Sequence, residues 1–364
     1  MLFALLFLSI PLFSQSYFYK DFRDTNITYK LNAVLDVKSD NLPLDFFDTE
    51  WKDYNKRRED NSAFGVASIT ATQNMQHFSF GFFRQKTSKI YLNSALIEVM
   101  HNSDNDFAHI LLYHQLYKDI GTAPLKGDAN DFDSFGVFAE KKFHLLVHHY
   151  FDAKLKLHYA TDFNYIKIKG KSTSDAFHGT LDYYYKNENR ISHAKNQSSN
   201  SYGYGYSVDL SYIYNRDKFY FYFGIYNIGS YIFWRNVSLM HYYFDSNTIY
   251  VGADGYNHYK PFGVGHYSYN INFTQQIPMH AESSINYELT DNIAVGDNIS
   301  LYEKMHYNEL YANVKIERLR YKLGYVAENY NLIFALYHKN FKFEISRGFD
   351  KSNKILQFKC EFLY

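Results

Sequence analysis

The chain has 364 residues and carries 38 Lys and Arg against 38 Asp and Glu, so its formal net charge is zero. Aromatic residues make up 20% of it, which excludes a chain disordered throughout, because such chains are poor in aromatics. The neutral balance argues against nucleic acid as a partner, and the single Cys excludes an internal disulfide or a Cys-based zinc site.

The first segment has the pattern of a secretory signal. Residues 1–13 read MLFALLFLSIPLF, and small residues follow at Ser14 and Ser16. The apolar run is shorter than the ~20 residues that a membrane-spanning helix needs. We therefore expect a cleaved signal peptide over residues 1–16 and export through the periplasm. The alternative is that the run is a buried first strand or helix.

The rest of the chain alternates between apolar and polar residues, which is the period of a β-strand with one apolar face. The clearest alternations cover residues 27–37, 202–214, 267–274, 281–289, 310–316 and 319–325. Further strand-like runs cover 64–72, 76–84, 89–100, 107–117, 135–151, 154–168, 179–187, 217–228, 230–244, 331–338, 340–347 and 354–364. The region 89–117 also suits a helix.

Polar connectors separate these strands. They cover residues 39–62, 118–133, 187–201, 252–263 and 348–353. No shift in composition marks a second domain, so residues 17–364 are expected to form a single domain.

Three features favour a barrel in a membrane over a soluble β-protein, and the first is the signal-like start, which exports the chain. The apolar faces are rich in Tyr and Phe, which suits the aromatic girdles at the two bilayer interfaces. The polar faces carry charges inside the strands, and such a face needs water or ion pairs, as the lumen of a barrel offers. The predicted lumen-facing residues are Lys30, Asp36, Glu282, Glu288, Glu309, Lys315, Glu317, Arg320, Lys322, Glu328, Lys342, Glu344, Lys359 and Glu361.

The predicted lumen charges are nearly balanced in sign. A balanced lumen argues against a strongly ion-selective pore. Six of these residues are expected on two neighbouring strands, where they could form a charged patch: Glu309, Lys315, Glu317, Arg320, Lys322 and Glu328. A packing network that holds the shape of the barrel is the preferred interpretation of this group.

The C-terminal end carries the most specific pattern. Phe358, Phe362 and Tyr364 alternate with Lys359 and Glu361. In this respect the chain resembles bacterial outer-membrane β-barrel proteins, whose last strand commonly ends on an aromatic residue. The resemblance implies a closing strand and recognition by the barrel-assembly machinery. Phe is the more usual last residue, so Tyr364 is a departure.

The expected fold is therefore all-β, a transmembrane antiparallel barrel of about 14–18 strands, with 16 as the preferred number. The strand count follows from the length of the chain and the ~9–11 residues that each membrane strand needs.

Metal and cofactor chemistry have little support in the sequence, and neither is expected. His144, His148 and His149 lack the same-face spacing of a strand-borne metal site. Asp128, Asp131 and Asp133 lack the full calcium-loop pattern and are expected in a solvated loop.

One motif suggests an enzyme. His101 and Ser103 are two residues apart, which places them on the same face if the segment is a strand. The spacing resembles the His-x-Ser-Asn element of outer-membrane phospholipase A and of lipid A deacylases, in which His acts as base and Ser as nucleophile. Asp104 stands where those motifs have Asn. A polar strand end is the alternative interpretation.

The preferred function is a porin-like channel or transporter, without an enzymatic role, in the outer membrane of a Gram-negative bacterium. Its expected partners are outer-membrane lipid, the barrel-assembly machinery and an unknown solute. Three alternatives remain: a lipid hydrolase using His101 and Ser103, a surface scaffold or adhesin that binds through loops such as 187–201, and a soluble secreted β-protein.

Overall fold

The computed structural model describes most of the chain. The described residues are 29–39, 60–75, 77–102, 121–173, 176–188, 194–198, 200–245, 247, 249–259, 263–302, 305–326, 331–338, 341–348 and 355–363. The predicted signal peptide, Ser103, Glu328 and Tyr364 lie outside them.

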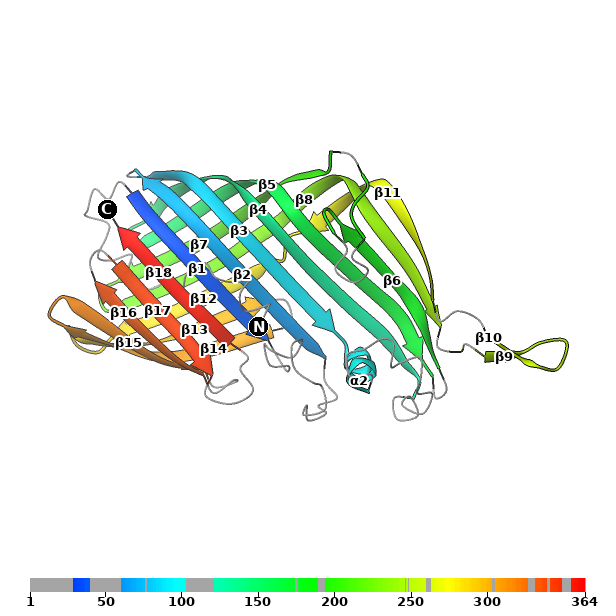
Figure 1. The fold of residues 1–364 in the computed structure, drawn as a ribbon. Coiled ribbons are helices and arrows are strands. Elements are labelled where there is room, and N and C mark those ends of the chain that lie inside the picture. Colours follow the sequence, from blue (N-terminus) through cyan, green and yellow to red (C-terminus); the bar gives the residue numbers. More distant parts are fainter. Residues whose placement is uncertain are drawn as a thin grey trace.

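Strands make up nearly all of the described chain (Figure 1). They are β1 (Tyr29–Ser39), β2 (Asn61–Asn74), β3 (Phe78–Leu92), β4 (Ala123–Leu146), β5 (His149–Ser172), β6 (Phe177–Tyr185), β7 (Tyr202–Arg216), β8 (Phe219–Asp245), β9 (Ile249–Val251), β10 (Asn257–Tyr259), β11 (Gly263–Gln276), β12 (His280–Glu288), β13 (Ile293–Tyr302), β14 (Met305–Ile316), β15 (Leu319–Val326), β16 (Asn331–His338), β17 (Phe341–Gly348) and β18 (Ile355–Leu363). One helix, α2 (Ser94–Asn102), follows β3.

The strands close into an antiparallel barrel. β1 pairs with β2 on one side and with β18 on the other, which joins the two ends of the sheet. The sheet has 16 strands, of which 14 form the closed ring. This confirms the predicted all-β antiparallel barrel, and β18 is the closing strand that the C-terminal pattern implied.

One side of the ring continues into a taller sheet. β8 is 27 residues long; its first part pairs with β7 and β12, and its last part pairs with β6 and β11. Residues with positive φ, such as Asn227 and Gly229, lie within β8 near the register shifts in its pairing with β7. Bulges of this kind bend a strand and increase its twist. We call β6, β11 and the paired parts of β4 (123–131), β5 (164–172) and β8 (238–245) the sheet extension.

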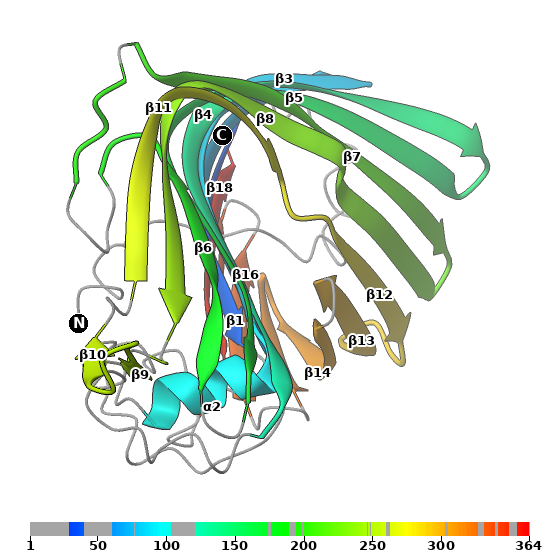
Figure 2. The ribbon, with the colours of Figure 1, turned by 90° about the vertical axis from the view of Figure 1, so that its right-hand side faces the viewer.

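Helix α2 packs on the sheet extension (Figure 2). Asn93 caps the helix by accepting a hydrogen bond from the Leu96 amide (3.2 Å), and its side chain also donates to the Pro124 carbonyl (2.7 Å). Ala95 and Val99, one turn apart, are buried against Leu125. The strand expected over 89–100 is therefore wrong beyond Leu92, and the helix that the sequence also allowed in this region is confirmed over Ser94–Asn102.

Two predicted connectors are also corrected. Residues 123–133 belong to β4 and were expected in a loop. Residues 249–259 contain the hairpin β9–β10, which forms a separate two-stranded sheet apart from the ring (Figure 1). Both segments are polar, and polarity alone does not distinguish a loop from a solvated strand. Among the described residues, no helix is long and apolar enough to cross a membrane.

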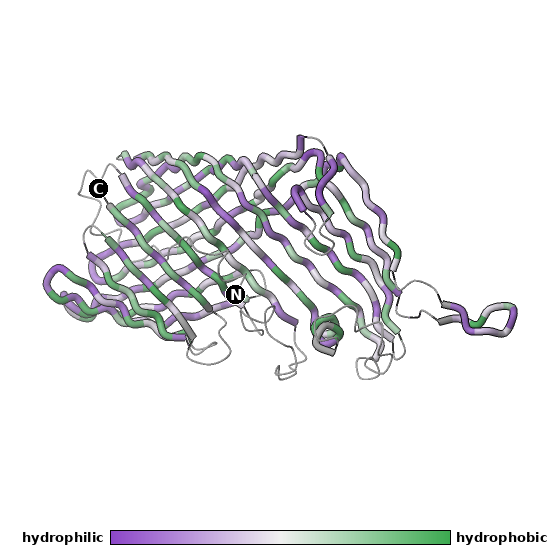
Figure 3. The backbone as a smooth tube through the Cα atoms, viewed as in Figure 1, coloured by the Kyte–Doolittle hydropathy of each residue, from purple (hydrophilic) through white to green (hydrophobic). Residues whose placement is uncertain are grey.

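The two faces of the ring differ in polarity, as predicted. Apolar side chains such as Leu310, Leu323 and Phe334 point outward and are exposed, whereas Lys322 and Glu344 point inward and are buried. Figure 3 shows the resulting alternation of hydrophilic and hydrophobic residues along neighbouring strands.

The aromatic residues are divided between both faces, which corrects the expectation that they lie mainly on the outer one. Trp234, Phe138 and Tyr311 are buried on the inner face. Each lies over a glycine of a neighbouring strand, where a Cβ atom would collide with the ring; the partner of Trp234, for example, is Gly203. Aromatic side chains that cover glycines in this way fill the interior and stabilise strand pairing.

Candidate functional site: the charged interior of the ring

Buried ion pairs line one wall of the interior. The ammonium of Lys322 on β15 lies 2.5 Å from Glu309 on β14 and 3.4 Å from Glu344 on β17. Lys322 is only 3% exposed. A buried charge is stable only when a partner of opposite charge and further hydrogen bonds compensate its lost hydration.

The same network continues to the strands that close the ring. Glu344 also contacts Lys359 on β18 (2.8 Å). Glu361, two residues further along β18, contacts Lys342 on β17 and Lys30 on β1, at 2.5 Å each. Two-residue spacing keeps these side chains on one face of each strand, so the whole set points inward.

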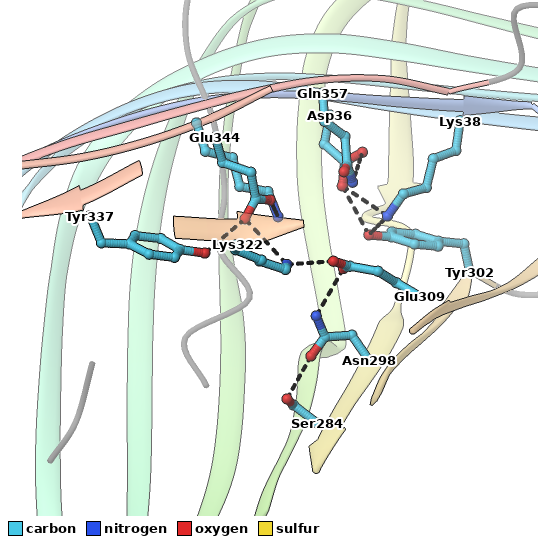
Figure 4. A network of polar contacts seen from close by, with 11 residues as sticks. Asp36, Lys38, Ser284, Asn298, Tyr302, Glu309, Lys322, Tyr337, Glu344 and Gln357 are labelled. Carbon is cyan, nitrogen blue, oxygen red and sulfur yellow. Dashed lines mark hydrogen bonds and ion pairs between the residues drawn. The ribbon is translucent and has the colours of Figure 1, made fainter. Parts of the chain in front are cut away.

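Neutral side chains complete the network (Figure 4). Asn298 on β13 donates to Glu309 (2.8 Å) and accepts from Ser284 on β12 (2.5 Å). The Tyr337 hydroxyl donates to Glu344 (3.3 Å). The polar interior is therefore a connected array reaching from β12 to β18.

Side chains from distant strands meet inside the ring. Lys38 on β1 donates to the Tyr302 hydroxyl on β13 (2.9 Å) and lies 3.0 Å from Asp36. Five strands of the ring, β14 to β18, separate β13 from β1. Asp36 also accepts hydrogen bonds from Tyr302 (3.2 Å) and from Gln357 (3.0 Å). We call Asp36, Lys38 and Tyr302 the cross-lumen contact.

An apolar layer lies beside the cross-lumen contact. Phe64 on β2 packs on the ring of Tyr302, with the two ring centroids 4.8 Å apart. The layer consists of Phe64, Val66, Tyr302, Met305, Tyr307, Val326 and Ile333, all buried. Tyr302 ends β13 and Met305 begins β14, so the layer lies near that end of the ring. Here the interior is filled by side chains from two walls.

A second group of inward charges lies on β4, β5 and β7. Lys154 contacts Glu140 (2.8 Å), and Lys156 contacts Asp209 (2.6 Å). His158, two residues further, lies between the hydroxyls of Ser134 (3.1 Å) and Ser207 (2.9 Å). This group is not among the predicted lumen residues, although Lys154, Lys156 and His158 alternate with Leu155 and Leu157, and this alternation is the signal that predicts it.

Most of the predicted lumen residues point into the ring. Asp36, Glu309, Lys322, Lys342, Glu344, Lys359 and Glu361 are buried there, and Lys30 and Glu282 are partly buried. Glu288 and Arg320 lie near strand ends and are partly exposed.

Two predicted lumen residues do not line the packed interior. Glu317 lies in the turn between β14 and β15, with a positive φ of 52°, because β14 ends at Ile316. Lys315 precedes that turn and is exposed. The alternation in the sequence continues through the turn, so its parity alone could not show where the strand ends.

Of the two residues of the enzyme alternative, the structure describes only the backbone of His101. His101 belongs to helix α2, whereas the same-face spacing was predicted for a strand, and Ser103 lies outside the described residues.

No group of three or more His, Cys, Asp or Glu among the described residues could hold a metal ion. The three aspartates of β4 have separate partners. Asp128 accepts from Tyr165 (3.0 Å), Asp131 from Ser88 (2.7 Å), and Asp133 from Arg84 (2.8 Å). His148 lies in the turn between β4 and β5, between His144 and His149.

Comparisons with known proteins identify no family. No family model and no curated protein matches the chain. Among solved structures, it is similar to a TodX deltaS2S3 mutant, a monoaromatic hydrocarbon channel (TM-score 0.46, 9% identity, 94% of this chain and 91% of that chain), and to the toluene transporter TodX of P. putida (TM-score 0.39, 10% identity, 92% and 87%). It also matches the siderophore receptor PirA from Pseudomonas aeruginosa (TM-score 0.18, 8% identity, 93% and 81%). At these low scores the assignment as a barrel is based on the chain's own strand pairing.

Proposed function

We propose that the protein is an outer-membrane β-barrel of a Gram-negative bacterium and acts as a channel or transporter for a small polar solute. In this proposal residues 1–16 are a cleaved signal peptide, and outer-membrane lipid surrounds residues of the ring. The C-terminal residues Phe358, Phe362 and Tyr364 are read by the barrel-assembly machinery.

The observation that carries the proposal is the polarity of the wall. Exposed apolar residues such as Leu310 and Leu323 cover the outside, and buried ion pairs such as Lys322 with Glu309 occupy the inside. Membrane barrels have this arrangement, whereas a soluble barrel has the reverse.

The mixed charge of the interior supports a polar solute. Lys154, Lys156, Lys322 and Lys359 are matched by Glu140, Asp209, Glu309 and Glu344 within a few strands. Balanced charges offer hydrogen bonds of both kinds to a passing molecule and disfavour strong selection for one sign of ion.

Passage requires that the cross-lumen contact opens. Tyr302 joins the two walls by its hydrogen bonds with Lys38 and Asp36, by the packing of the Lys38 ammonium over its ring, 4.4 Å from the centroid, and by its contact with Phe64. A displacement of the Tyr302 side chain away from these three residues would break all of these contacts without breaking any strand pairing.

Planar-bilayer recording tests the proposal. We expect Tyr302→Ala to raise the single-channel current severalfold above that of the unmodified protein, because it removes one side of the cross-lumen contact, and Lys38→Ala to raise it less, because Asp36 still accepts a hydrogen bond from Tyr302. Tyr325→Ala is the matched control: Tyr325 lies on the outer face, so the current should stay unchanged.

The contradicting outcome is equally clear. If the unmodified protein and the folded Tyr302→Ala and Lys38→Ala barrels insert repeatedly and none of them carries a current, passage through the lumen is wrong and a scaffold or adhesin role is favoured.

A further inference from the structure

Three lysines lie together on one face of the sheet extension. On β4 and β5, Leu125 and Ile168 pack in the core that α2 covers. The residues that alternate with them point to the opposite face, because successive side chains of a strand point to opposite sides. These residues include Lys126, Lys169 and Lys171, and all three are exposed.

The face with the three lysines is continuous with the inner face of the ring. β4 pairs with β3 without a register shift, so Lys126 lies on the same face as Phe138, which is buried inside the ring. The outer face of the same part of β4 meets α2 instead. The lysines therefore lie where one side of the ring continues into the taller sheet (Figure 1).

Two of the lysines are direct cross-strand partners. Lys126 pairs with Lys169, and Lys171 lies two residues further along β5. Neighbouring strands are about 5 Å apart, and two residues of a strand span about 7 Å. Like charges placed directly opposite each other destabilise a sheet. Among the described residues, none of the three lysines forms an ion pair that would offset this repulsion.

Another lysine on the same face of β5 has the opposite environment. Lys167 pairs with Asp128 on β4 and with Asp182 on β6, so carboxylates flank it on both sides. Lys169, two residues further, is flanked instead by the lysine of β4 and by Thr180 on β6. The excess of positive charge therefore begins at Lys169 and is confined to the part of the face beyond Lys167.

Strand β6 adds polar groups to this surface. Thr180 pairs with Lys169, and His178, which is exposed, pairs with Lys171. The next carboxylate in this row, Asp245 on β8, lies beyond His178. Ammonium groups only donate hydrogen bonds, so the ligand that matches the surface is an anion with several acceptor oxygens. We call Lys126, Lys169, Lys171 and Thr180 the basic wall.

We propose that the basic wall binds solutes that carry a phosphoryl group. Such a group has about two negative charges at neutral pH and three acceptor oxygens, and lysine binds it as a point charge on a long, adaptable stem. The ligand is a solute and not a lipid headgroup, because the basic wall continues the inner face of the ring. The inference rests on the proposed function and names its class of solute: the basic wall concentrates the anion, and the balanced charges of the ring then let it pass.

Calorimetric titration of the purified, folded barrel in a non-ionic detergent tests the basic wall. The probes are glycerol phosphate and glycerol, at constant ionic strength. We expect glycerol phosphate to bind, with an affinity that falls as salt is added, and glycerol not to bind. Lys169→Gln should weaken the binding of glycerol phosphate by about tenfold, the loss expected when one charged hydrogen bond is removed. Lys169→Arg keeps the charge and should keep most of the affinity.

Two further measurements separate binding from folding. Lys315→Gln removes an exposed lysine just before the turn between β14 and β15, outside the sheet extension, and should bind glycerol phosphate as the unmodified protein does. Without ligand, Lys169→Gln should unfold at the same temperature as the unmodified barrel or at a higher one, because it removes the repulsion with Lys126. Heat-modifiable gel mobility confirms that each variant is folded.

Three outcomes would overturn the proposal. Glycerol phosphate that binds Lys169→Gln as well as the unmodified barrel, or binds neither, would show that the lysines are only a solvated surface. An equal loss in Lys315→Gln would show a general effect of net charge. Binding of phosphatidic acid micelles without binding of glycerol phosphate would show that the ligand is a lipid headgroup. A barrel that binds glycerol phosphate and carries no current would instead contradict the proposed function and leave the basic wall in place.

Discussion

The ring and the sheet extension share strands, but the same face of the sheet is exposed in the ring and buried in the sheet extension. On β4, Phe135 in the ring is 48% exposed, whereas Leu125 in the extension is 1% exposed. Both residues lie on the same face of the strand, because the register of β4 against β3 has no shift. In the extension, helix α2 covers this face with Ala95 and Val99.

The boundary between the two environments is marked by polar pairs on the outer face. Arg84 on β3 contacts Asp133 on β4, and Ser88 donates to Asp131. Beyond this line, the outer face of β4 lies under α2. One face of β4 is therefore exposed in the ring and buried in a protein core in the sheet extension, and in the proposed membrane location the exposed part would face lipid.

The largest effect is expected for the buried charges of the ring. Lys322→Ala leaves Glu309 and Glu344 without their shared cation, which should lower the free energy of unfolding by about 3–5 kcal/mol. Chemical unfolding from detergent or vesicles measures the change. Unfolding that matches the unmodified barrel would show that water, and not Lys322, stabilises these carboxylates.

A pair of Leu→Ala variants compares the two regions directly. Leu125→Ala opens a cavity under α2 and should lower the free energy of unfolding by about 2–5 kcal/mol. Leu157→Ala removes an exposed side chain from the outer face of the ring, where lipid refills the space, and should cost clearly less. Equal losses in the two variants would contradict the difference between the regions.

The smallest effect is expected at the boundary. Arg84→Ala breaks the ion pair with Asp133, in which the Arg84 side chain is 71% exposed. Such exposed pairs contribute about 0–1 kcal/mol. The same unfolding experiment should therefore show little change, and a loss comparable to that of Lys322→Ala would place this pair in a dry environment.

Periodicity was sufficient to predict the antiparallel barrel and most of the inward charges. A strand has only two faces, and alternate residues lie on the same face. Once one face is known to be apolar, Asp36, Lys322 and Glu344 must lie on the other face of their strands. Parity carries no information about where a strand ends, so it did not place the end of β14 before Glu317. For the segment after Leu92 the sequence left strand and helix open, and the structure has a helix capped by Asn93.

The contacts between distant strands were also beyond the sequence. The meeting of Lys38 with Tyr302 depends on the curvature of the whole ring and on what fills it. The inward aromatic residues were not predicted for a related reason. Trp234 lies inside because Gly203 on the adjacent strand leaves room for its ring. The register of the two strands sets this pairing, and the sequence does not show that register.

The most direct test of the account is which face of the ring meets lipid. Phe135→Trp and Phe138→Trp place a fluorophore on opposite faces of β4, in a chain whose Trp51 and Trp234 are replaced by Phe. In vesicles that contain brominated lipid, the account predicts strong quenching of the tryptophan at position 135 and little at position 138. Equal quenching of both, or stronger quenching at position 138, would contradict it.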